Sequence, residues 1–228
     1  MLPYLFDSTM VLLLPALLLA GWAQFRVKST FERYSRVGTR RGVTADQVAR
    51  MLLDRFGLTS VSVNRVAGHL TDHYDPRDNT LSLSDSVYGN ASIAAIGVAA
   101  HEVGHAIQKN TGYVPLEVRN NIVPVVNIGS AMAMPLFFFG LFFNGSALMD
   151  IGILLFLGVV IFHLITLPVE FNASSRAVAV LGQTGALGAD ELQGASKVLN
   201  AASWTYIAAT LMAVMQLVRL LALRNSRD

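Results

Sequence analysis

Four stretches of the chain are almost continuously apolar: residues 5–25, 122–143, 149–167 and 204–223. Each is close to the roughly 20 residues that a helix needs to cross the hydrocarbon core of a bilayer. In the second and third stretches the apolar residues face all directions of a helix rather than one stripe, which favours membrane spans over core helices of a soluble protein. For the fourth stretch the sequence leaves open whether it crosses the membrane or lies at the interface.

The polar segment after the first apolar stretch predicts a small mixed domain. Helical spacing of apolar residues predicts a helix at residues 43–58, with Thr44 and Gln47 as its capping-box pair. Alternation of apolar and polar residues predicts a strand at residues 59–66. Turn-forming residues in the middle of residues 69–84 predict two further short strands.

Composition supports a membrane protein. Charged residues make up 14% of the 228 positions and hydrophobic residues 53%, whereas an ordinary soluble domain has roughly 25% charged residues. The chain has no cysteine, which excludes disulfides and thiolate metal ligands.

Basic residues gather directly after the first apolar stretch, at Arg26, Lys28, Arg33, Arg36, Arg40 and Arg41. By the positive-inside rule this places residues 26 to about 120, and later residues 168–203, in the cytoplasm. We read the basic residues as a collar facing lipid headgroups rather than a nucleic-acid site.

The first stretch lacks a basic start, so an uncleaved anchor fits better than a signal peptide. A crossing fourth stretch would place Arg224 and Arg227 outside, against the rule.

A cluster of polar residues interrupts an otherwise apolar helix that we predict to begin after Ser92. His101 and His105 are four residues apart, so their rings point to the same side of a helix, one turn apart. Glu102 lies about 100° round the helix, away from a shared metal but within reach of a water molecule on it. The helix is otherwise Ala, Gly, Val and Ile, so it has no solvent-exposed polar face on which these three residues would be expected by chance.

The pattern H-E-x-x-H is that of zinc hydrolases. Zinc held by imidazole nitrogens keeps one position open, lowers the pKa of its water to about 7 and polarises a carbonyl. A neighbouring carboxylate takes the proton of that water and passes it to the leaving amine. We therefore predict a metal site with Glu102 as general base.

Catalytic zinc sites use three protein ligands, so one more is needed. His163 lies too deep in the third apolar stretch, whereas Glu170 falls just beyond it. If a helix continues through Pro168, Glu170 shares one face with small residues that can pack against Gly104. The alternative is a carboxylate that merely lies at the membrane interface.

Two segments carry a family resemblance: "DHYDPRDNTLSLSDSVYGNASIAAIGVAAHEVGHAIQ", residues 72–108, and "VEFNASSRA", residues 169–177. The chain resembles the bacterial YugP-like family of neutral zinc metallopeptidases of the membrane, over most of its length. The pattern is also similar to HtpX-type and CAAX prenyl proteases, in which a glutamate beyond two membrane spans is the third zinc ligand.

The resemblance implies that Zn²⁺ is bound by His101, His105 and Glu170, with Glu102 as the base. The chain departs from those relatives at Ser174, where they have aspartate. We therefore expect the orientation of His101 or His105 to come from elsewhere.

The resemblance also implies a zincin-like core, in which an edge strand before the metal helix receives the substrate as an added strand. The residues in that place are Thr80, Leu81, Ser82, Leu83 and Ser84; an ordinary sheet strand is the alternative. A donor to the tetrahedral intermediate is also needed, and the candidates are Arg176, His73 and Tyr74. Arg176 could equally pair with a lipid phosphate.

Together these features predict a mainly α membrane protein with about four transmembrane helices and a small α+β zincin-like metalloprotease domain. The expected parts are an anchor (1–25), a cytoplasmic domain (26–121), a transmembrane hairpin (122–167), a cytoplasmic segment with the third ligand (168–203), and a final transmembrane or interfacial helix with its tail (204–228).

The expected function is that of a gluzincin-like zinc endopeptidase, multi-pass in the bacterial plasma membrane, that cuts membrane-associated or unfolded polypeptides at the cytoplasmic face. Its partners would be a polypeptide substrate and the lipid bilayer, with no nucleic acid. The alternatives are a non-catalytic membrane scaffold that keeps a zinc site and a zinc hydrolase of a non-peptide bond. The sequence does not determine the oligomeric state.

Overall fold

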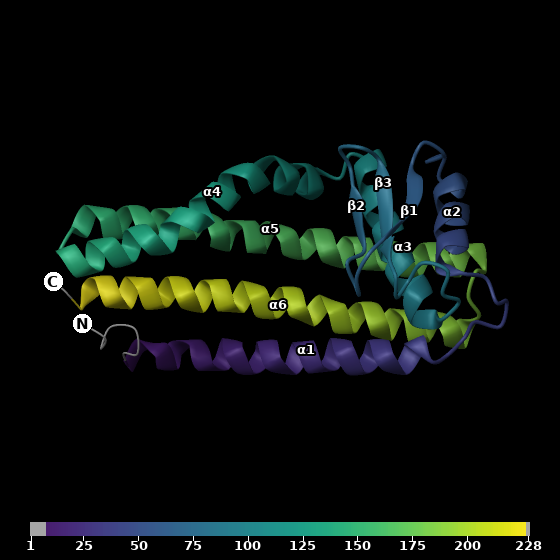
Figure 1. Cartoon of the computed structure of the whole chain (residues 1–228), viewed down its shortest axis with the longest axis horizontal. Helices are drawn as coiled ribbons and strands as arrows, with labels where there is room; N and C mark the ends of the chain where they lie inside the picture. Colours follow the sequence, from purple (N-terminus) through teal and green to yellow (C-terminus); the bar gives the residue numbers. More distant parts are fainter. Residues whose placement is uncertain (1–7, 227–228) are drawn as a thin grey trace. The chain divides into compact units, whose positions relative to one another are not determined.

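The computed structural model describes residues 8–226 (Figure 1). Its elements, in chain order, are η1 (Ser8–Leu13), α1 (Leu14–Ser35), α2 (Ala45–Arg55), β1 (Ser62–Val66), β2 (His73–Asp75), β3 (Thr80–Ser84), α3 (Ile93–Asn110), α4 (Val114–Phe143), α5 (Ser146–Thr184) and α6 (Ala189–Asn225). Residues 5–7 of the first expected span, and Arg227 of the tail, lie outside the described residues. The mainly helical architecture with one small sheet confirms the predicted fold class.

The chain divides into two compact units. Of the described residues, the first unit contains 8–23, 118–168 and 205–226, and the second contains 24–117 and 169–204.

Four helical segments within residues 8–226 are long and apolar enough to cross a membrane: Ser8–Ser35, Val114–Phe143, Ser146–Thr184 and Ala189–Asn225. Many large apolar side chains on them are exposed, as lipid-facing residues are. In the first unit, α4 and α5 approach closely in their hairpin, because a Cβ on Gly140 would lie 2.7 Å from the backbone nitrogen of Met149. Small residues at such contacts are typical of helix pairs in membranes.

The last helix ends beside the turn of the α4–α5 hairpin. Arg224 Nε donates to Asp150 Oδ1 at 2.9 Å, and both residues belong to the first unit. Five residues earlier in the same helix Arg219 is buried, and its Nε donates to Thr9 Oγ1 at 3.2 Å. Within the first unit, the guanidinium of Arg224 is thus paired with a carboxylate of the hairpin.

In the second unit the strands have the order β1-β3-β2. β1 runs parallel to β3, with Ser62 opposite Thr80, and β2 runs antiparallel to β3, with His73 opposite Ser82. The core of this unit includes side chains from α2, the sheet, α3 and the second-unit parts of α5 and α6, among them Leu52, Leu53, Leu81, Leu83, Ile96, Leu181 and Leu199. The predicted helix and three strands are confirmed, and Thr44 N–H donates to Gln47 Oε1 at 3.2 Å, as the capping pair requires.

The expectation that residues 80–84 form an edge strand is wrong. β3 is the central strand, and both of its backbone edges are hydrogen-bonded, one to β1 and one to β2. It therefore has no free edge to which a substrate strand can be added. The short strand β2 lies at one edge of the sheet instead.

The helix α3 forms where its local signals place it. Ser92 Oγ accepts a hydrogen bond from Ala95 N–H at 3.3 Å, which caps its N-terminus. Gly97 faces α6, since a Cβ there would lie 3.4 Å from the Cβ of Ala195. The glycines that weaken this helix locally thus allow neighbouring helices to approach closely.

Candidate metal centre

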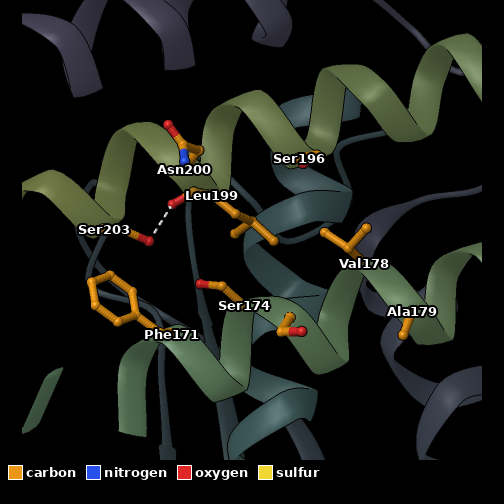
Figure 2. Close-up of a pocket in the computed structure, with 9 residues that line it drawn as sticks. Phe171, Ser174, Val178, Ala179, Ser196, Leu199, Asn200 and Ser203 are labelled. Atoms are coloured by element: carbon orange, nitrogen blue, oxygen red, sulfur yellow. Dashed lines mark hydrogen bonds between the residues drawn. The ribbon is translucent and has the colours of Figure 1, made fainter. Parts of the chain in front are cut away.

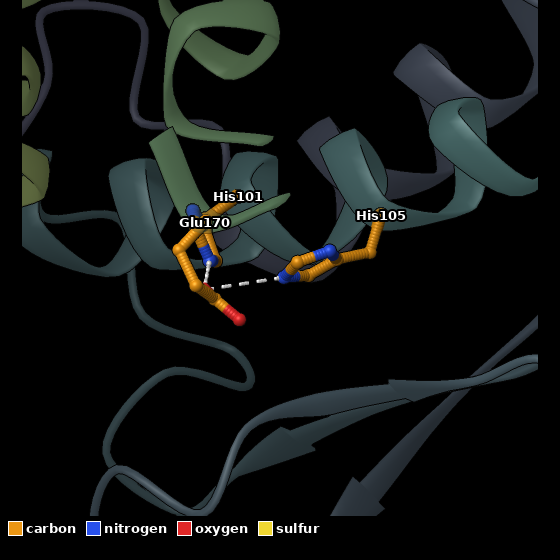
Figure 3. A group of neighbouring side chains, drawn as sticks. All are labelled: His101, His105 and Glu170. Carbon is orange, nitrogen blue, oxygen red and sulfur yellow. Dashed lines mark hydrogen bonds and ion pairs between the residues drawn. The ribbon is translucent and has the colours of Figure 1, made fainter. Parts of the chain in front are cut away.

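One face of α3 presents two imidazoles to the same point. The ring centroids of His101 and His105 are 4.8 Å apart and nearly perpendicular, at 86°. This follows from their spacing, since residues four apart on a helix lie one above the other. Figure 3 shows both rings extending from α3 toward a third side chain.

The third side chain is that of Glu170 on α5. Its Oε2 lies 3.2 Å from His101 Nε2 and 3.6 Å from His105 Nε2 (Figure 3), and the residue is only 3% exposed. One potential ligand atom from each of the three residues lies within 4.8 Å of the others. The expected continuation of the helix through Pro168 is confirmed, because α5 is unbroken from Ser146 to Thr184.

The close packing of α3 on α5 within the second unit makes this convergence geometrically feasible. A Cβ at Gly104 would lie 2.5 Å from the carbonyl oxygen of Ala173, closer than real Cβ contacts allow. The predicted packing of the small-residue face around Glu170 against Gly104 is therefore confirmed. Any larger residue at position 104 would push the two histidines away from the glutamate.

The environment of the cluster is negatively charged. Burial lowers the pKa of His105, but the hydrogen bond with Glu170 and the charges of Glu102 and Glu170 raise it by more, so that pKa lies above its ordinary value. A site that holds protons in this way also attracts cations. Protons and a metal ion compete for the same nitrogen, so metal affinity falls as the pH falls.

Ser174 reaches the other side of the first imidazole. Its Oγ lies 3.1 Å from His101 Nδ1, so the expectation that this serine leaves the orientation of His101 to other residues is wrong. Ser174 also lines a pocket of about 500 Å³ between α5 and α6 (Figure 2). The rest of its lining is mixed: polar side chains of Ser175, Ser196, Asn200 and Ser203, and apolar side chains of Phe171, Val178, Ala179 and Leu199.

Glu102 is held beside the cluster by the sheet. The carboxylate is buried, and its Oε2 accepts the backbone N–H of Tyr74 at 3.0 Å. Tyr74 belongs to the edge strand β2, so the edge of the sheet directly contacts the carboxylate of the H-E-x-x-H pattern. The hydrogen bond fixes one carboxylate oxygen of Glu102.

The three candidate donors to an oxyanion make other contacts. His73 is exposed, with Nδ1 2.9 Å from the Thr71 carbonyl oxygen. Burial, and then the charges of Asp75 and Asp78, raise the pKa of Tyr74, and its neutral phenol donates to Asn79 Oδ1 at 3.1 Å.

Arg176 is likewise engaged elsewhere. Its Nε donates to Asn172 Oδ1 at 2.7 Å, and its guanidinium lies 5.9 Å from the ring centre of Tyr113.

Comparison with known proteins decides the family. Residues 9–225 match the family described as "Putative neutral zinc metallopeptidase". The chain belongs to this zinc metallopeptidase family. It is 48% identical over 218 residues to the "Putative membrane protease YugP" of Bacillus subtilis (strain 168), which covers 95% of this chain and 97% of the relative. No solved structure shows a significant match.

Membership of the zinc metallopeptidase family confirms the resemblance seen in the sequence and makes zinc the metal of the family. The cluster of two imidazoles and a carboxylate offers donors that zinc accepts. Residues 8–226 also supply four helices suited to a membrane, in keeping with a membrane protease family.

Sequence reasoning missed one residue of the cluster, Gln108. It is completely buried, and its Oε1 lies 2.9 Å from His105 Nδ1. A signal was available, because Gln108 follows His105 by three positions and His101 by seven, on the same face of the helix. Glutamine is an uncommon residue on an otherwise apolar buried face.

Proposed function

We propose that the protein is a membrane-embedded zinc endopeptidase that hydrolyses peptide bonds of membrane-associated or unfolded polypeptides. The convergence of His101 Nε2, His105 Nε2 and Glu170 Oε2 is the observation that carries the proposal. These three residues hold the zinc, as in gluzincin-type sites. Three protein donors are the number used by catalytic zinc sites, whereas structural sites are closed by four.

When bound, zinc polarises the carbonyl of the scissile bond and makes a water molecule more acidic. Glu102 is the general base: its carboxylate takes a proton from the attacking water and delivers it to the nitrogen of the leaving amine. The bond from Tyr74 N–H supports this role, because it keeps the carboxylate beside the cluster without neutralising it.

The substrate binds along the outer edge of β2. Two observations support this: β2 is an edge strand, and its Tyr74 contacts Glu102. An extended peptide that pairs with this edge gains main-chain hydrogen bonds whatever its side chains are, from backbone groups other than the Tyr74 N–H that Glu102 accepts. This suits a protease that acts on unfolded polypeptides, and completes a zincin-like arrangement of metal helix and edge strand.

Metal removal tests the activity itself. The purified full-length protein in detergent should contain about one zinc per chain and cleave unfolded casein. Dialysis against a chelator should reduce cleavage to background, and added zinc should restore it, whereas a serine-protease inhibitor should have no effect. Persistent cleavage by metal-free protein would contradict the proposal, and retained zinc without cleavage of any polypeptide would favour the scaffold alternative.

We assign the cluster to the cytoplasmic face of a bacterial plasma membrane, on the basis of the basic residues after the first apolar stretch. The chain has no native cysteine, so single cysteines can report topology. In intact cells a membrane-impermeant thiol reagent should label Ala147→Cys, near the hairpin turn, and should label Thr59→Cys only after permeabilisation. The reverse pattern would place the cluster outside.

A further inference from the structure

A chain of hydrogen-bonded polar side chains begins at the second imidazole, His105, and leads away from the metal centre through the buried Gln108 to the half-buried Asn172 and Arg176. Gln108 Oε1 lies 2.9 Å from His105 Nδ1. The Nε2 of the same amide donates to the Val169 carbonyl oxygen at 2.8 Å and to Asn172 Oδ1 at 3.0 Å. Gln108 is 0% exposed, so water has no access to replace these partners.

The acceptor at Val169 decides which way the amide of Gln108 points. A backbone carbonyl can only accept hydrogen bonds, so the nitrogen of Gln108 must face it. The amide oxygen is then left to face His105 Nδ1. Because that oxygen can only accept, Nδ1 must carry the hydrogen, and Nε2 of the neutral ring is the nitrogen with a free lone pair. That nitrogen is the one facing Glu170.

Asn172 and Arg176 continue this series of hydrogen bonds, which we call the amide relay, and they fix the orientation of the Gln108 amide in the same sense. Asn172 Oδ1 accepts from Gln108 Nε2 and also from Arg176 Nε, at 2.7 Å. Arginine has only donors, so the oxygen of Asn172 cannot exchange places with its nitrogen without losing both bonds. The guanidinium of Arg176 lies over the ring of Tyr113, at 5.9 Å from its centre, which holds the end of the relay.

The first imidazole differs. His101 Nδ1 faces a serine hydroxyl, which can donate or accept, so this contact does not select one tautomer. Ser174 also borders the pocket between α5 and α6, which polar and apolar side chains line together (Figure 2). The constraint on tautomer is therefore specific to His105.

We propose that Gln108 is a positioning residue that, anchored by Asn172 and Arg176, holds His105 in the Nδ1–H form and presents Nε2 to the zinc. The inference rests on the proposed role of His105 as a ligand. It also gives Arg176 a function different from that of an oxyanion donor: its Nε orients the amide relay.

Two substitutions at position 108 separate positioning from packing. Gln108→Met keeps the size but removes the acceptor, and should weaken zinc binding by about 10- to 100-fold, the usual cost of losing a group that orients a ligand. Gln108→Glu keeps an oxygen against Nδ1 but loses the donors to Val169 and Asn172. It should lower the thermal midpoint of the apo-protein yet retain most of the zinc affinity. Zinc affinity is measured by competition with a chelator in detergent.

The exposed Gln183→Met on α5 is the matched control, and should bind zinc as the wild type does. Wild-type affinity in Gln108→Met, or an equal loss of affinity in Gln108→Glu, would overturn the proposal.

If Gln108→Met does not fold, the tautomer of His105 can still be measured in the wild-type protein. In zinc-loaded protein labelled with ¹⁵N-histidine, long-range ¹H–¹⁵N spectra should show His105 protonated at Nδ1. Protonation at Nε2 would overturn the inference. If the His105→Ala variant bound zinc as tightly as the wild type, the proposed ligand set would be refuted instead. Failure of the inference about Gln108 and failure of the proposed ligand set are therefore distinguishable.

Discussion

Glu102→Gln is expected to abolish peptide cleavage while leaving the zinc in place. Proton transfer by a positioned side chain contributes about 10²- to 10⁴-fold to rate, and glutamine can neither accept nor return that proton. The fold should be retained, because the side-chain oxygen of glutamine can still accept the N–H of Tyr74 that Glu102 Oε2 accepts at 3.0 Å. The three potential metal ligands are not altered.

The measurement combines zinc content with the cleavage rate of unfolded casein, both on the purified full-length variant. Glu117→Gln is a matched control, since Glu117 is exposed in the first turn of α4; it should cleave at the wild-type rate. Cleavage by Glu102→Gln at the wild-type rate would rule out Glu102 as the base. Loss of zinc along with activity would instead show that Glu102 maintains the metal site.

Glu170→Gln should lose both the metal and the activity. Its Oε2 lies 3.2 Å and 3.6 Å from the Nε2 atoms of His101 and His105. The side chain is 4% exposed, so water has little access to take the place of the carboxylate oxygen. We expect zinc affinity to fall by more than the roughly 100-fold upper limit for residues that only orient a ligand. The reason is that a neutral amide replaces the anionic donor of the group formed by His101, His105 and Glu170.

Zinc retained after dialysis and the thermal midpoints of the apo- and zinc-loaded forms report this effect. In the wild type zinc should raise the midpoint, because a ligand that binds only the folded state stabilises it; in Glu170→Gln this increase should vanish. Glu117→Gln again serves as the control. A variant that keeps its zinc through dialysis would remove Glu170 from the proposed ligand set and leave the H-E-x-x-H pair with another partner.

The helices, and the location of the metal helix, could be predicted because their signals are local. Apolar runs mark the four long helices, and Ser92 caps α3. The spacing of His101 and His105 places both rings on one face whatever the rest of the chain does. The strands of residues 62–66, 73–75 and 80–84 were likewise predictable from alternation and turn residues.

Strand order and hydrogen-bond partners could not be predicted in this way. β3 is central because β1 pairs with it in parallel and β2 in antiparallel orientation, and neither pairing has a signature within the five residues of the strand. Ser174 stands where related proteases have a carboxylate, yet its hydroxyl lies 3.1 Å from His101 Nδ1. The role of Gln108 depends on Val169 and Asn172, which are more than sixty positions away.

The sequence by itself determined which segments are apolar enough for a membrane and which helix carries two imidazoles and a carboxylate, because helix periodicity and hydropathy are properties of neighbouring residues. Only the tertiary structure decided which edge of the sheet meets Glu102 and which groups contact each ring nitrogen. Those contacts depend on the approach of α5 to α3 at Gly104, a distance that arises from packing between segments far apart in the chain.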